Sequence, residues 1–249
     1  VYASHWEAAV LPNSNFKYKI PTANIANWTT PLYNDAAWTN GQCGIGYGDG
    51  DDVSVVAGNT VSFYVRKSFN LVDTSTILNG VLNIDFDDAF VAYLNGTEIA
   101  RSGMNAGIPA YNDIANQSHE AQMYQNGNPE YYFINQTLFK SLIRNGNNVL
   151  SIEIHNESAA SSDLTCIPFL NIEIANNVYN YSPTPIWFVP PFTSSNLPLI
   201  IINTLNNQSI PDDPKIQADM KVIYNGAGQI NHINDVPNYQ GMIGIEGRG

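Results

Sequence analysis

An acidic strand end followed by an Asn-Gly turn is the feature that most constrains the fold of this chain. Over residues 82–87, apolar residues alternate with polar ones, so one face of a strand enters a core and the other meets water. Asn95-Gly96 then supplies two residues that tolerate the positive φ of a type I′ turn. Residues 85–101 are therefore predicted to form a β-hairpin.

The same alternation recurs along the chain, with turn residues between the segments. It is found at residues 61–66, 150–155 and 170–174, and in each case we expect the polar side chains to face water. One short helix is predicted over residues 136–144, because apolar residues follow helical spacing there and Asn135 can cap the start. The pattern as a whole predicts an all-β fold, an antiparallel β-sandwich.

Composition divides the chain into three parts. Residues 1–176 carry the strand patterns of the sandwich, and residues 177–196 are rich in Pro, Ser and Thr, which favours an extended linker. Residues 197–249 contain three further strand-like runs, at 199–202, 220–224 and 242–245, and are predicted to be a β-rich second domain. The polar segment 102–130 is predicted to be a long loop over one end of the sandwich, clamped by Arg101.

The charge of the chain excludes several classes of partner. Its 249 residues carry a formal net charge of -12, which repels phosphate backbones and anionic lipid headgroups. The longest apolar run, Leu197 to Ile202, is far shorter than the roughly 20 residues that span a bilayer. The chain begins at Val1 and has few Lys residues, as in an exported product whose signal peptide has been removed. We expect a secreted or cell-surface protein that binds neutral polymers and cations, with neither nucleic acid nor membrane insertion.

Cys43 and Cys166 are the two cysteines of the sequence. Neither belongs to a C-x-x-C pair, so zinc binding by cysteines has no support. A disulfide between them would close a loop of over a hundred residues and stabilise the fold by about 4 to 5 kcal/mol. We expect this disulfide, and two buried free thiols are the alternative.

Several motifs in order resemble a known family. They are Trp28, residues 35–38, 44–52 and 64–69, the predicted hairpin at 85–101, and residues 148–150, 155–156 and 161–164. Together they resemble a galactose-binding-like jelly-roll domain of bacterial secreted proteins, over roughly residues 5 to 175. The resemblance implies a sandwich that commonly holds a structural calcium. The tail, from Leu197 to Gly249, resembles the opening of the spore-coat protein H kinase-like family, whose nucleotide-binding and catalytic residues lie downstream of this point.

The Gly-rich loop at residues 44–52 is the candidate metal site. Asp49, Asp51 and Asp52 place several hard oxygen ligands within a few residues, as Ca²⁺ requires of a flexible site. A complete site would need outside ligands such as Glu7 or Asp163. The alternative is a solvated acidic turn.

Two further acidic motifs do not make a catalytic centre. Asp87 and Asp88 are adjacent in a strand, so their side chains point to opposite faces and cannot form the paired carboxylates of a glycosidase. His119-Glu120 begins like a zinc-protease motif, but Met123 stands where the second His belongs. We assign no catalytic residue, and expect one of the two Asp residues to accept hydrogen bonds from backbone or sugar and the other to face solvent.

Tyrosines and amides in the loops are the candidate sugar ligands, because a phenol ring stacks on a sugar and an amide bonds its hydroxyls. The predicted set is Tyr47, Asp87, Asp88, Tyr111, Tyr124, His155 and Asn156. We therefore predict a non-catalytic module that binds extracellular carbohydrate or docks its parent protein on a surface. The alternatives are an assembly unit that pairs through its C-terminal strands with a neighbouring chain or downstream domain, and the front end of a secreted kinase-like enzyme.

Overall fold

The computed structural model describes residues 4–205 and 208–247, and the chain divides into two compact units, residues 1–188 and 189–249. The division falls inside the predicted linker. The first half of that linker belongs to the first unit, because Ser182 and Pro183 pair with the strand at Glu7 and Ala8.

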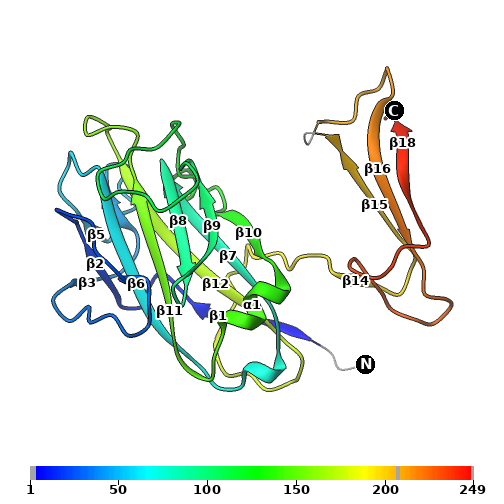
Figure 1. The fold of residues 1–249 in the computed structure, drawn as a ribbon, viewed down its shortest axis with the longest axis horizontal. Helices are drawn as coiled ribbons and strands as arrows, with labels where there is room; N and C mark the ends of the chain where they lie inside the picture. The colour runs from blue at the N-terminus through cyan, green and yellow to red at the C-terminus, as the bar shows by residue number, and fades with distance from the viewer. Residues whose placement is uncertain (1–3, 206–207, 248–249) are drawn as a thin grey trace. The chain divides into compact units, whose positions relative to one another are not determined.

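The first unit is an all-β sandwich of two sheets, and the predicted fold class is confirmed (Figure 1). Sheet A has the order β10-β7-β12-β1-β13, with β4 paired to β12 and β5 to β4. Its strands are β10 (Glu130–Ile134), β7 (Ile77–Asp87), β12 (Leu164–Ile174), β1 (His5–Val10), β13 (Ser182–Pro183), β4 (Ile45–Tyr47) and β5 (Ser54–Val55). Sheet B has the order β3 (Thr39–Gly41), β2 (Phe16–Lys19), β6 (Ser62–Leu71), β11 (Gly146–His155), β8 (Ala89–Leu94) and β9 (Thr97–Ser102).

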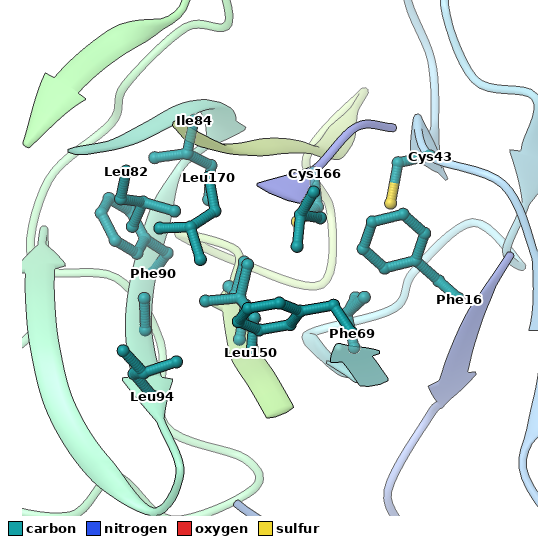
Figure 2. Packing of buried hydrophobic residues seen from close by; sticks show 14 of the residues in the cluster. Phe16, Cys43, Phe69, Leu82, Ile84, Phe90, Leu94, Leu150, Cys166 and Leu170 are labelled. Carbon is teal, nitrogen blue, oxygen red and sulfur yellow. The ribbon is translucent and has the colours of Figure 1, made fainter. Parts of the chain in front are cut away.

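The core lies between the two sheets. Leu82, Ile84 and Leu170 of sheet A face Phe90, Leu94 and Leu150 of sheet B, and all six are buried (Figure 2). Burying an apolar side chain of this size contributes roughly 1.5 to 3 kcal/mol relative to leaving it in water. The apolar half of each predicted strand alternation therefore forms the core, as expected.

The predicted helix is confirmed as α1 (Gln136–Leu142). The side chain of Asn135 caps it by accepting a hydrogen bond from the backbone N–H of Leu138 at 3.1 Å. Two short 3₁₀ turns, η1 (Thr74–Thr76) and η2 (Met123–Gln125), complete the helical segments of this unit. In the described parts of the chain no helix is both long and apolar enough to cross a membrane.

The predicted hairpin is correct in its second half and wrong in its first. β8 and β9 pair across Asn95-Gly96, whose φ values of 53° and 94° suit the predicted turn. Residues 82–87, however, belong to β7 in sheet A and pair with β10 and β12. The chain crosses from one sheet to the other at Asp87 and Asp88, so the acidic pair marks a change of sheet and not the arm of a hairpin.

The polar faces of the strands are not open to water, which corrects the expectation of one dry and one wet face. Glu153, His155 and Asn171 are each at most 1% exposed. Segments far away in sequence cover them: His155 Nδ1 lies 2.8 Å from the carbonyl oxygen of Asp113, in the long loop after β9. Both outer faces therefore carry buried polar side chains.

The expected disulfide is not present, and the two cysteines are the buried free thiols of the alternative. The strand register gives the reason, because Cys166 of β12 lies opposite Ile45 and not opposite Cys43. In Figure 2 the sulfur of Cys43 points toward the ring of Phe16. Both side chains act as small apolar groups of the core.

The second unit contains a three-stranded antiparallel sheet in the order β15-β16-β18 and a short pair, β14 with β17. The bounds are β15 (Leu199–Thr204), β16 (Ile216–Ile223), β18 (Tyr239–Ile245), β14 (Ser194–Ser195) and β17 (Asn231–His232). The three strands predicted from the sequence are all present, each longer than expected.

Candidate functional site

Four connections meet at one end of the sandwich, where β4, β7, β9 and β11 end and β8 and β12 begin. They are the loop after β4, the bend between β7 and β8, the long loop after β9 and the loop between β11 and β12. Asp49, Glu120 and Asp163 come from three of these loops, and one carboxylate oxygen of each lies within 4.8 Å of the others. We call these three residues the acidic triad.

Asp163 is held in place by a hydrogen-bonded group around Asn156. The amide Nδ2 of Asn156 donates to the backbone oxygen of Asp163 at 3.0 Å and to the hydroxyl of Tyr47 at 3.1 Å. Tyr47 in turn donates to the backbone oxygen of Ser161 at 3.3 Å. Asn156 is fully buried, so it positions the loop and does not meet a ligand itself.

Glu120 is positioned by carboxylates at the ends of the strands. Asp85 accepts hydrogen bonds from the backbone N–H groups of Gln122 and Met123, at 2.7 and 2.8 Å. Asp88 accepts from the N–H groups of His119 and Glu157, at 2.9 and 2.7 Å. The carboxylates of Asp85 and Asp88 therefore tie loops to the sandwich. Asp88 has the backbone role expected for one of the Asp87-Asp88 pair, but Asp87 is buried and does not face solvent as expected.

Asp87 lies beneath the triad and is 2% exposed. Its Oδ1 has no hydrogen-bond partner among the described residues. Burial, and then the charges of Asp88, Asp163, Glu120 and Asp49, raise the pKa of Asp87 to about 8. The charges of all three triad members therefore raise the pKa of one buried carboxyl group, that of Asp87.

The pKa of Asp49 is also raised, to about 6, by burial and then by its acidic neighbours, with Asp163 first. Such a concentration of like charges favours a bound cation, because the cation removes the repulsion.

Asp51 and Asp52 lie beside the triad but are not members of it. Asp52 Oδ1 accepts a hydrogen bond from Thr165 at 2.9 Å, and burial raises its pKa to about 7. Asp52 Oδ2 and both carboxylate oxygens of Asp51 lack partners within residues 4–205 and 208–247. Of the predicted metal ligands, the structure therefore brings Asp49 together with Asp163. Glu7 is not part of this group, and its carboxylate accepts hydrogen bonds from the backbone N–H groups of Asn180 and Tyr181.

Two of the predicted tyrosines stand at this end. Tyr124 lies on η2, partly exposed, and its hydroxyl accepts a hydrogen bond from the Gln125 side chain. The carboxylates of the triad contribute, after burial, to raising the pKa of Tyr124, so its phenol lies close to them. The pKa of Tyr47 is raised by burial and then by Asp163. Both rings therefore lie beside the triad.

Two other predicted ligand residues lie elsewhere. Tyr111 packs against a separate cluster of aromatic side chains on the outer face of sheet B, and its N–H donates to Asn24. His155 is 0% exposed, and its Nε2 lies 3.4 Å from Glu153. The structure does not bring either residue to the triad.

Arg101 clamps the start of the long loop, as predicted, by donating to the backbone oxygens of Asn105 and Gly107. Sequence reasoning does not identify Glu120 as a ligand, because in the sequence this residue belongs only to an incomplete zinc motif. Its place in a long polar loop next to acidic strand ends was the available signal.

Cavities lie along the long loop as well. One of about 400 Å³ is lined by residues 104–109 and 113–116, and another of about 310 Å³ includes Trp28, Tyr64 and Glu153 in its lining. Neither is lined by a member of the triad.

Comparison with known proteins gives no family. No protein-family model matches the chain, and no curated protein matches it. Similar solved structures include a glycosyl hydrolase family 2 member from Bacteroides cellulosilyticus DSM 14838, with a TM-score of 0.43 and 10% identity over 88% of this chain and 24% of that one. A beta-glucuronidase from Bacteroides uniformis has a TM-score of 0.44 and 8% identity over 89% of this chain and 22% of that one. An uncultured Clostridium sp. beta-glucuronidase has a TM-score of 0.40 and 12% identity over 98% and 40%.

The chain spans about a quarter of the length of the first of these structures. Similarities this low assign neither a family nor a function to the chain. The resemblance of the tail to the spore-coat protein H kinase-like family gains no support from them.

Proposed function

We propose that the sandwich is a non-catalytic carbohydrate-binding or surface-docking module of a larger extracellular protein. The observation that carries this proposal is the convergence of the acidic triad with Tyr47 and Tyr124 at one end of the sheets. Loops at the end of a rigid sandwich are where binding residues are commonly placed. This end would be the binding surface.

Calcium is the cation that suits the triad best. Ca²⁺ takes 6 to 8 oxygen ligands in a flexible geometry, and carboxylates from separate loops supply such ligands. Asp49, Glu120 and Asp163 come from three loops, so one ion would hold all three in a single arrangement. Extracellular modules bind Ca²⁺ with dissociation constants of about 10⁻⁴ to 10⁻³ M, which fits the proposed location at the cell surface or outside the cell.

A neutral polysaccharide is the partner that suits the charge. The net charge of -12 disfavours polyanions, and the phenol rings offer flat faces on which a sugar can stack. An exposed site with few such groups binds with a dissociation constant on the order of 0.1 to 1 mM, equivalent to about 4 to 5.5 kcal/mol. Membrane insertion and nucleic-acid binding are not part of the proposal.

Affinity gel electrophoresis of the full chain in millimolar Ca²⁺, against a panel of neutral polysaccharides, tests this function. We expect retention on at least one polysaccharide, lost in Tyr124→Ala and kept in Tyr224→Ala. Tyr224 is an exposed tyrosine of the second unit and serves as the matched control. No retention on any polysaccharide, with the sandwich folded, would contradict the proposal.

A second candidate function, assembly through the C-terminal strands, is favoured by one observation. The β15-β16-β18 sheet has an apolar face to which Ile200, Ile202, Met220, Val222, Tyr239 and Ile243 belong by strand register. Ile200 is 65% exposed, and exposed apolar faces of this kind commonly meet a partner.

Analytical ultracentrifugation over a range of concentrations tests assembly. We expect a self-associating species that Ile200→Lys abolishes and Gln240→Lys, on the opposite face of the same sheet, preserves. A wild-type chain that stays monomeric throughout argues against this candidate.

A further inference from the structure

We propose that the cation in the acidic triad contacts the glycan directly, by taking two neighbouring hydroxyl groups of a neutral sugar into its coordination shell. This inference rests on the proposed function and adds to it the receptor atom and the chemical class of ligand. The ion would then be part of the binding surface as well as a brace for the loops.

The first support is the exposure of the triad. Asp49 and Glu120 are exposed and Asp163 is partly so, which puts the metal position at the surface. Three carboxylates supply three to six of the 6 to 8 oxygen ligands that Ca²⁺ takes, and water fills the rest. Water ligands that face solvent can be exchanged for sugar hydroxyls, which are also hard oxygen donors.

The second support is independent of the triad itself. Four carboxylate oxygens at this end are buried without a hydrogen-bond donor within the described residues: Asp87 Oδ1, Asp51 Oδ1, Asp51 Oδ2 and Asp52 Oδ2. Asp87 is 2% exposed, and its charge interacts with all three triad members. Leaving such oxygens unpaired is costly in the absence of a cation.

Side-chain cations do not supply this charge. In the described part of the chain, no Lys or Arg forms an ion pair with Asp87 or with a triad member. The charged neighbours that act on the carboxyl groups of Asp87 and Asp49 are all carboxylates. A counter-charge for the ionised carboxylates would therefore come from solution.

The surroundings leave room for a sugar. A Cβ atom added at Gly50, next to Asp49, would meet no atom within 4 Å, so this side of the triad is open. The phenol of Tyr124 lies close enough for the triad charges to act on it. A sugar whose hydroxyls reach the ion could place its apolar face on that ring.

Charge selects neutral sugars over acidic ones. The triad and Asp87 carry up to four negative charges, and a divalent cation neutralises two of them. The loaded site would remain negative, so a uronic acid would be repelled while a neutral vicinal diol would not.

Terbium luminescence on the full chain tests the inference, with Tb³⁺ as the probe in place of Ca²⁺. We expect emission sensitised by tyrosine, weakened in Asp49→Asn and in Glu120→Gln and kept in Asp219→Asn, an acidic residue of the second unit. Emission lifetimes in H₂O and D₂O count the water molecules on the ion. Saturating methyl α-mannopyranoside or methyl β-galactopyranoside should lower that count by about two.

Affinity gels with and without EDTA separate this inference from the proposed function. Retention that EDTA abolishes and Ca²⁺ restores supports both. Retention that persists in EDTA overturns the direct contact between the ion and the sugar. So does a count of bound water that neither neutral sugar changes while the chain still binds polysaccharide. Both outcomes leave the proposed function standing. No retention under any condition overturns both. Melting temperatures of the two triad variants show whether they remain folded.

Discussion

The hydroxyl of Tyr93 donates a hydrogen bond of 2.5 Å to Oε1 of Glu153, a carboxylate that is 1% exposed on the outer face of sheet B. The other carboxylate oxygen of Glu153, Oε2, lies 3.4 Å from Nε2 of His155. The opposite ring nitrogen of His155 lies 2.8 Å from the backbone oxygen of Asp113. This row of polar contacts joins β8 and β11 to the long loop that also carries Glu120.

Tyr93→Phe should destabilise the sandwich by about 1 to 3 kcal/mol, because a buried carboxylate loses a hydrogen-bond donor. Denaturant unfolding measures the loss. Tyr64→Phe on the same sheet face is the matched control, since the Tyr64 hydroxyl has no hydrogen-bond partner among the described residues. Equal losses in the two variants would show that the bond to Glu153 contributes nothing.

The same residues show what the sequence could predict. The two faces of β11 are predicted correctly from the alternation of apolar Ile152 and Ile154 with polar Glu153 and His155. This two-residue period depends only on local strand geometry. It does not reveal that the polar face is covered, because the covering segments lie at residues 20–38 and 103–116, far from β11 in sequence. Tertiary structure decides whether a polar face meets water.

Arg66→Met should destabilise the fold by about 3 kcal/mol or more, because the guanidinium of this buried residue holds the segment before β3. It donates to Asp35 at 2.8 Å and to the backbone oxygens of Trp28 and Thr30. Asp35→Asn should cost less, since the Asp35 side chain is 24% exposed and the two carbonyl contacts remain. Thermal unfolding of both variants checks this order, and a larger loss in Asp35→Asn would reverse the interpretation.

Gly80→Ala should destabilise the protein by about 1 to 3 kcal/mol through overpacking. A Cβ atom at Gly80 of β7 would lie 2.4 Å from the ring of Phe139, so α1 would have to move off the sheet. Gly58→Ala is the control, because a Cβ there would meet no atom within 4 Å, and it should change stability by less than about 0.5 kcal/mol. Similar melting temperatures for the two variants would contradict the close packing of α1 on β7.

The candidate site was partly accessible to sequence reasoning. Asp49 and Asp163 could be proposed as ligands because acidic side chains in Gly- and Ser-rich loops suit calcium. Glu120 could not be placed, because its position depends on Asp85 and Asp88 binding the backbone of a loop more than thirty residues away. Hydrogen bonds of this kind leave no periodic signal in the sequence.

Two thiols per chain should react with Ellman's reagent in denaturant, and none in the native state. Burial raises the pKa of Cys43 and of Cys166, so neither native thiol forms the reactive thiolate. A chain that shows no reactive thiol in denaturant until it is reduced would contain the disulfide after all.

Asp87 should make the metal-free protein less stable as pH rises. Its folded pKa of about 8 lies above the ordinary value of 3.8, so the native state binds more protons than the unfolded state between these values. Stability therefore falls as pH increases from about 4 to 8. Asp87→Asn removes this titration, and it should be more stable than the wild type at pH 8 without metal, with the difference shrinking toward pH 4.

Calcium should reverse the order of stability at pH 8, because the ion stabilises the charged wild-type site and binds more weakly to the variant. Calorimetry in EDTA and in Ca²⁺, with Asp219→Asn as control, measures both effects. An unchanged pH dependence in Asp87→Asn would mean that this carboxyl group is not the buried acid beneath the triad.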